Sequence, residues 1–119
     1  MAELQIVERR EGDVTVLDLW GRITIGETSE ALRGEITRLG EGGRNRILLH
    51  LGGVDRIDSS GLGNLVACCA SVRRRGGDLK LVGLSGRLHD LMVMTKLLTV
   101  FDTYDDEGRA LESFGPAAA

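Results

Sequence analysis

The stretch Ile57-Asp58-Ser59-Ser60-Gly61-Leu62-Gly63 places one carboxylate directly beside two hydroxyl groups. It follows the apolar run 47–51 and a Gly52-Gly53 pair, which together predict a strand and then a loop. It precedes apolar residues that recur with helical spacing, at Leu62, Leu65, Val66, Cys69 and Val72. Asp58 and Ser59 are therefore expected at a helix N-terminus, where free N–H groups and the helix dipole favour negative charge. Such residues can simply cap the helix or can receive a phosphate group.

Size and charge limit what the chain can be. A chain of 119 residues suits one domain, and its 42% hydrophobic residues are enough for a packed core. Only 3% of the residues are aromatic, so the core must be aliphatic. The net charge of −3 argues against nucleic acid as a partner, because phosphate backbones are bound by clustered basic charge.

The one dense basic run is Arg73-Arg74-Arg75. It closes a predicted helix just before Gly76-Gly77, where cations complement the helix dipole. We interpret this run as a solvated helix end rather than a ligand-binding patch.

Two adjacent cysteines, Cys68 and Cys69, match neither a metal-ligand spacing nor a plausible disulfide. Cys69 falls on the apolar face and is expected to pack as a small hydrophobic residue. No metal and no cofactor is predicted. The sequence shows no signal peptide and no apolar run long enough to span a membrane, so a cytoplasmic location is expected.

The patterning along the chain predicts a single α/β domain, with a mixed sheet of four to five strands packed against about four helices. The expected strands cover 4–10, 14–20, 46–51, 79–84 and 100–104. The first two form a hairpin, and Val14, Val16 and Trp20 are expected on one face of the second. The first helix is expected to be capped by Thr28 or Ser29, and the third by Ser85 with Leu98 inside it. The domain is expected to span 1–115, with a disordered tail at 116–119.

The stretch 57–63 resembles the phosphorylation-site motif of bacterial anti-sigma factor antagonists, which are small members of the STAS domain family. The likeness covers nearly the whole chain. Residues 21–23 resemble the family's glycine turn before the first helix, and residues 83–88 resemble the start of its third helix. Residues 100–104 with Ala110-Leu111 resemble its C-terminal strand and helix.

This resemblance implies a binding protein that is not an enzyme. In the family, an anti-sigma factor that is itself a serine kinase phosphorylates the serine after the aspartate, here Ser59. Unphosphorylated antagonist binds the anti-sigma factor and frees the sigma factor, and a PP2C-type phosphatase reverses the modification. The implied partner-binding residues are Asp58, Ser59, Ser60, Gly61, Leu62, Gly63 and Thr24. Ser60 is a candidate cap of the helix, and a weak homodimer is left open.

The chain departs from the family pattern in two places. Thr24 and Ile25 stand near the start of the first helix, where the family usually has an acidic residue that helps contact the kinase. Lys96 stands where a glycine commonly ends the third helix.

Other functions are weighed against this resemblance. A hydrolase would place Ser59 in a G-x-S-x-G turn with a histidine base, but His50 and His89 are expected to be structural. Gly61-Leu62-Gly63 lacks the third glycine of a dinucleotide-binding motif. A receiver domain phosphorylated on Asp58 would need further acidic residues to hold magnesium. The remaining alternative is a STAS binding subunit of a transporter or signalling complex that is never phosphorylated.

Overall fold

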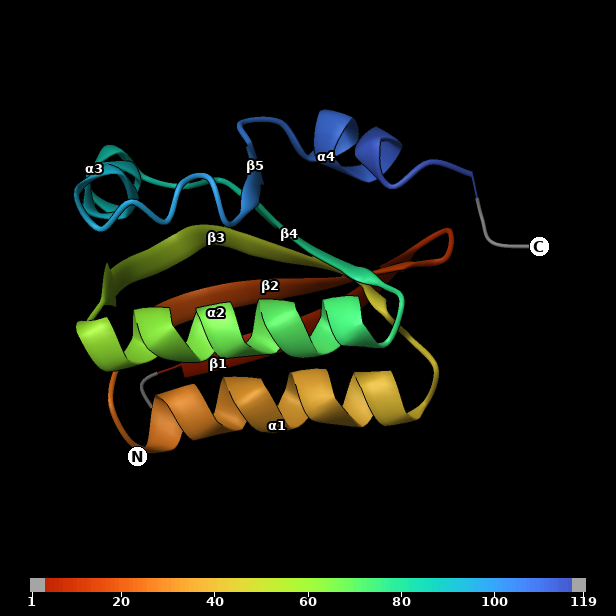
Figure 1. Cartoon of the computed structure of the whole chain (residues 1–119), viewed down its shortest axis with the longest axis horizontal. Coiled ribbons are helices and arrows are strands. Elements are labelled where there is room, and N and C mark those ends of the chain that lie inside the picture. Colours follow the sequence, from red (N-terminus) through yellow and green to blue (C-terminus); the bar gives the residue numbers. More distant parts are fainter. Residues whose placement is uncertain (1–3, 117–119) are drawn as a thin grey trace.

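The computed structural model describes residues 4–116, which form five strands and four helices (Figure 1). The strands are β1 (Leu4–Glu11), β2 (Val14–Ile23), β3 (Arg46–Ile57), β4 (Asp78–Val82) and β5 (Asp102–Tyr104). The helices are α1 (Glu27–Glu41), α2 (Ser59–Arg74), α3 (Gly86–Met94) and α4 (Glu107–Ser113). The predicted α/β class with its mixed sheet is confirmed. Of the predicted tail, residues 117–119 lie outside the described residues.

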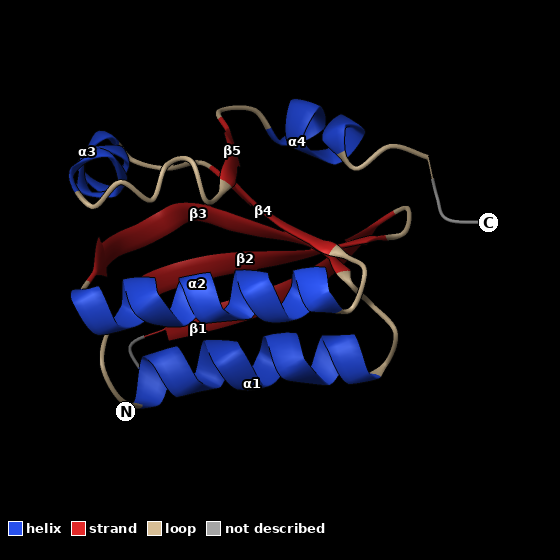
Figure 2. Cartoon of the chain, in the orientation of Figure 1, coloured by secondary structure: helices blue, strands red, loops and turns tan. Residues whose placement is uncertain are grey.

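The strands form one sheet in the order β1-β2-β3-β4-β5 (Figure 2). The predicted hairpin is present, because β1 and β2 pair antiparallel across a turn that contains Gly12 at a φ of 65°. From β2 to β5 neighbouring strands are parallel, and a helix joins each pair. Parallel neighbours require such crossovers, since a short turn cannot return the chain to the same end of the sheet.

The two faces of the sheet bury separate apolar clusters. The larger cluster receives side chains from α1, α2 and α3, including Leu32, Leu65 and Leu88. The smaller cluster lies under α4, where Ala110 and Phe114 cover Val14, Val16, Leu48 and Val82. In Figure 1, α1 and α2 accordingly lie side by side below the sheet, and α4 lies above it. No helix within residues 4–116 has both the length and the apolar character needed to cross a bilayer.

Strand β3 is longer than predicted. It was expected to end at Leu51, but it continues through Gly52-Gly53 to Ile57, because β2 pairs with it as far as Ile23 opposite Ile57. The glycines fit this strand because other side chains fill the space that their own would take. A Cβ on Gly53 would lie 2.2 Å from Trp20 Cδ1, and one on Gly52 would lie 2.7 Å from His50 Cε1.

Three further sequence predictions are corrected. Leu98 lies outside α3, which ends at Met94, although it still packs against the larger core from the following turn. Strand β4 stops at Val82, so 83–84 belong to the connection to α3. Trp20 is 46% exposed instead of sharing the buried environment of Val14 and Val16, and the β2–β3 register shifts between Asp18 and Trp20.

Helix α3 is followed by a residue in the left-handed backbone conformation that glycine adopts most easily. Lys96 has a φ of 60° and is the one non-glycine residue among those described with a positive φ. Its N–H donates to Val93 O at 3.1 Å, and the N–H of Leu97 donates to Met92 O at 2.9 Å. This pair of hydrogen bonds is the Schellman motif, whose left-handed residue is most often glycine. The family pattern that puts glycine here therefore has a backbone cause.

We predict that Lys96→Gly stabilises the protein by roughly 0.5–1 kcal/mol, because the left-handed conformation strains any residue with a Cβ and glycine's greater freedom in the unfolded chain offsets part of the gain. Urea denaturation measures the change. Lys96→Ala is the matched control, since it removes the charge and the long side chain but keeps the Cβ. An equal gain in both variants would show that the strain at Cβ is not the cause.

Candidate functional site

Ser59 is the first residue of α2, and its side chain is exposed. Only Asp58 separates the helix from the end of β3, so the loop expected between strand and helix is absent. Ser60 is also exposed in the first turn. The prediction that Ser60 caps the helix is wrong, because Asp58 occupies the N-cap position.

Asp58 holds two parts of the chain together through one carboxylate. Its Oδ1 accepts the N–H of Gly61 at 2.7 Å, which caps α2. Its Oδ2 accepts the N–H of Ile25 at 2.9 Å, from the connection between β2 and α1. The hydrogen bonds from Gly61 and Ile25, followed by the charge of Arg56, lower the pKa of Asp58 below its ordinary value. Asp58 is therefore ionised at neutral pH and has both oxygens engaged.

The connection between β2 and α1, which Asp58 contacts through Ile25, is also held by hydrogen bonds of Thr24. The Thr24 carbonyl accepts the hydroxyls of Thr28 at 3.1 Å and Ser29 at 2.7 Å, and the Thr24 N–H donates to Thr28 Oγ1 at 3.0 Å. Thr28 and Ser29 are thus buried in the first turn of α1 and bond backwards, while Gly26 is the N-cap. The prediction that either hydroxyl caps α1 is wrong. The structure nevertheless brings the predicted residue Thr24 into the loop held by Asp58.

The two motif glycines have different surroundings. A Cβ on Gly61 would lie 2.0 Å from Ile23 O, so this glycine lets the first turn of α2 pack on the end of β2. The space beside Gly61 is therefore filled from within the domain and is not open to a partner. Gly63 is exposed, and its Cβ would meet nothing within 4 Å. Leu62 is buried, at 3% exposure.

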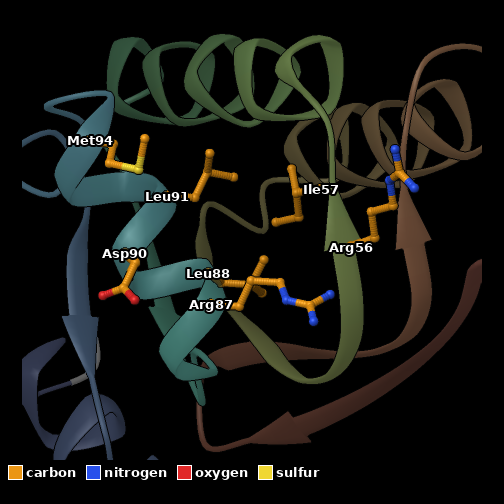
Figure 3. Close-up of a pocket in the computed structure, with 7 residues that line it drawn as sticks. All are labelled: Arg56, Ile57, Arg87, Leu88, Asp90, Leu91 and Met94. Atoms are coloured by element: carbon orange, nitrogen blue, oxygen red, sulfur yellow. The ribbon is translucent and has the colours of Figure 1, made fainter.

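An apolar hollow begins beside Ser59. It has a volume of about 400 Å³ and runs between the start of α2 and the end of α3. Its lining residues are Ser59, Leu62, Gly63, Val66, Leu91, Thr95 and Leu97. Leu91 also lines a second hollow of about 600 Å³ between the end of β3 and α3 (Figure 3). Motif-based reasoning missed this surface because its α3 residues are distant in sequence from 57–63.

Two apolar side chains in the segments around this site are strongly exposed. Met94 at the second hollow is 80% exposed, and Ile25, whose N–H bonds to Asp58, is 75% exposed. The exposure of Met94 adds apolar surface to the second hollow, as a docking site requires. The exposure of Ile25 next to Asp58 follows from the fold and could not be inferred from the sequence.

Asn64 is a further site residue that sequence reasoning missed. Its side-chain amide donates to Ser29 O at 2.7 Å and so ties α2 to the first turn of α1. It directly follows the predicted stretch, and its polar side chain among apolar neighbours was the available signal.

The two histidines and the two cysteines have different surroundings. His50 is half-buried on β3, and its Nδ1 accepts the Gly52 N–H at 3.1 Å, whereas His89 is exposed on α3. Both cysteines are buried, and burial raises the pKa of Cys68 to about 11. A thiol with a raised pKa is a poor nucleophile at neutral pH.

Comparison with known proteins agrees with this geometry. The model of the STAS domain matches residues 5–110. The chain belongs to the STAS domain family. It is 34% identical to the anti-sigma-B factor antagonist of Bacillus subtilis over 96 residues, which cover 81% of this chain and 85% of the relative. The resemblance seen in the sequence is thereby confirmed.

Solved structures extend the comparison to the fold. A Thermotoga maritima protein described as an anti-sigma factor antagonist superposes with a TM-score of 0.82 at 25% identity, over 93% of this chain and 95% of that one. A sulfate transporter family protein of Wolinella succinogenes has a TM-score of 0.75 at 23% identity, over 87% of this STAS chain and 85% of that one. The second likeness is one of fold alone.

We predict that Gly61→Ala destabilises the domain by about 1–3 kcal/mol or more, because the added Cβ would have to displace the main chain of Ile23. Gly63→Ala is the matched control in the same helix, and we expect it to be neutral or to stabilise by up to about 1 kcal/mol. Thermal denaturation of the two variants measures the difference. Equal effects at both positions would contradict the assigned packing of Gly61.

We also predict a pH-dependent contribution from Asp58. Because its folded pKa lies below the unfolded value, its stabilisation is complete above the unfolded pKa, about 4, and is lost as the pH falls through the lowered folded value. Asp58→Ala should cost about 1 kcal/mol at pH 7 from the lost cap, and the difference from wild type should shrink in acid. Urea denaturation between pH 7 and pH 3 measures it. A difference that stays constant down to pH 3 would contradict the ionised cap.

Proposed function

We propose that this STAS domain is an anti-sigma factor antagonist whose binding is controlled by phosphorylation of Ser59. The observation that carries the proposal is the exposure of Ser59 at the first position of α2, beside a carboxylate whose two oxygens each accept a backbone N–H. A kinase can reach this hydroxyl without unfolding the helix. The similarity to the anti-sigma-B factor antagonist supports the choice of partner class.

The position also suits a phosphate group. Phosphorylation adds about −1.5 to −2 charges, and an anion near a helix N-terminus is stabilised by roughly 0.3–1 kcal/mol. Phospho-Ser59 is therefore expected to leave the fold nearly intact. Its effect falls on the partner, because the new dianion stands at the rim of an apolar hollow that a docking protein would cover. Bringing a dianion into a contact without a matching cation is unfavourable.

The partners follow from this mechanism. An anti-sigma factor with serine kinase activity binds the unphosphorylated form and transfers phosphate from ATP to Ser59, and a PP2C-type phosphatase removes it. The contact surface comprises Asp58, Ser59, Ser60, Gly63 and Thr24 at the surface, with Leu62 lining the hollow beside them. Gly61 acts by positioning the helix. A kinase that uses cellular ATP places the switch in the cytoplasm.

The test is phosphorylation of the purified domain with ATP and a candidate kinase, with the site located by mass spectrometry. We expect Ser59→Ala to abolish incorporation while keeping kinase binding, and Ser59→Asp to weaken binding by about tenfold or more. Ser60→Ala is the matched control, since Ser60 is also exposed in the same turn and should leave Ser59 phosphorylated. Normal incorporation into Ser59→Ala would overturn the assignment.

The alternative is a STAS binding subunit of a transporter or signalling complex that is never phosphorylated. The fold likeness to a sulfate transporter family protein is the observation in its favour. It predicts that Ser59→Asp leaves partner binding unchanged, whereas the switch predicts a loss.

A further inference from the structure

A basic hollow lies at the end of the domain opposite Ser59. It is formed where α1 and α2 end and the β1–β2 hairpin turns, at the right of Figure 1. Helix α2 has 16 residues, so about 24 Å of helix separates this end from Ser59. The hollow has a volume of about 340 Å³. Its lining residues are Arg10, Asp13, Gly43, Arg44, Asn45, Arg46, Arg75, Gly76 and Gly77.

The four arginines come from three segments that only the fold brings together. Arg10 belongs to β1 and Arg46 to β3, Arg44 precedes β3, and Arg75 is the C-cap of α2. They face one lining carboxylate, Asp13, so the wall of the hollow carries a formal charge of +3 in a protein whose net charge is −3.

Neighbouring acids neutralise only part of this charge. Arg46 pairs with Asp13 at 3.1 Å, and Arg44 pairs with Glu8 at 3.3 Å. Within residues 4–116, Arg10 and Arg75 form no salt bridge and no side-chain hydrogen bond, and both are exposed. The guanidinium groups of these two residues are therefore the positive charge of the hollow that no neighbouring acid neutralises.

Arg75 is held in place by a contact with α1. A Cβ built on Gly40 would lie 1.7 Å from Arg75 Nη1 and 2.8 Å from Cζ, so the guanidinium lies against the helix where Gly40 has no side chain. Glycine inside a helix is unfavourable relative to alanine by roughly 1 kcal/mol. Its presence here lets Arg75 lie across the end of α1 instead of extending into solvent.

We propose that this hollow binds the phosphate groups of a small phosphorylated molecule. Guanidinium groups bind phosphate oxygens through paired hydrogen bonds, and several in one hollow match a group that carries more than one negative charge. The hollow is concave and near the lower end of the size range of small-molecule sites, which favours a compact anion over an extended acidic chain. The site is separate from the Ser59 surface and does not depend on the proposed switch.

Pyrophosphate is the probe for this proposal, and its binding is measured at low salt from the NMR shifts of the backbone amide groups. We expect saturable shifts at Gly43, Gly76 and Gly77, and about tenfold weaker binding in the Arg10→Gln/Arg75→Gln double variant. Arg109→Gln is the matched control, because Arg109 is exposed on α4 outside the hollow, and it should bind as wild type does.

Gly40→Ala tests the geometry without changing any charge. The new methyl group must push the Arg75 guanidinium aside, which a flexible side chain can do while the helix stays folded. We therefore expect weaker pyrophosphate binding with unchanged or higher thermal stability. Binding that survives both Gly40→Ala and the double variant would overturn the proposal.

Vesicles containing phosphatidic acid form a second arm, which separates a lipid headgroup from a soluble ligand. Pyrophosphate binding that the double variant weakens supports the site whether or not vesicles bind. Vesicle binding without pyrophosphate binding overturns the proposal, because it would reflect a diffuse basic surface. Shifts spread over arginines throughout the domain would overturn it as well.

Discussion

The joint between β3 and α2 depends on the carboxylate of Asp58. One oxygen satisfies an N–H group at the start of α2, and the other holds the connection before α1 through Ile25. This second hydrogen bond joins residues that are 33 positions apart in sequence, beside the backbone hydrogen bond that the Asp58 N–H donates to Ile23 O at 3.3 Å. Since the residue next to it carries the exposed hydroxyl, the carboxylate also fixes where that hydroxyl stands.

The packing around this joint separates residues that maintain the fold from residues that face solvent. Gly61 lies against Ile23, Leu62 is buried, and Asn64 bonds to Ser29, so each serves the interior. Ser59, Ser60 and Gly63 alternate with them on the outer side of the same turn. A charge added on that outer side meets the N-terminal end of the helix dipole and disturbs little of the core. This division is what allows a surface to change its binding properties while the domain remains folded.

The two ends of helix α2 lie at opposite ends of the domain and favour opposite charges. Its N-terminus carries the hydroxyl beside an apolar hollow, and its C-terminus ends among arginines. The asymmetry follows from the helix itself, because the N-terminal end favours anions and the C-terminal end favours cations. At the C-terminal end, however, the cations exceed what the helix and the neighbouring carboxylates neutralise.

The sequence by itself determined the fold class, the order of the elements and the place of Ser59. Apolar periodicity and glycine punctuation are local signals, and the Asp-Ser-Ser-Gly-Leu-Gly stretch is specific enough to identify the family. The sequence also marked the position of Lys96 as unusual, because the family commonly has a glycine there. Nearly all of the candidate phosphorylation site could therefore be predicted from the sequence alone, since its residues are contiguous.

Only the tertiary structure decided which residues cap the helices and which surfaces exist. Asp58, Ser60, Thr28 and Ser29 are all acceptable caps by type, and the choice depended on where β3 ended and where Thr24 O lay. Strand β3 continued past two glycines because β2 pairs with it as far as Ile57, while Trp20 and His50 occupy the space beside the glycines. The hollow beside Ser59 and the arginine hollow combine residues from distant segments, and no local pattern specifies such contacts.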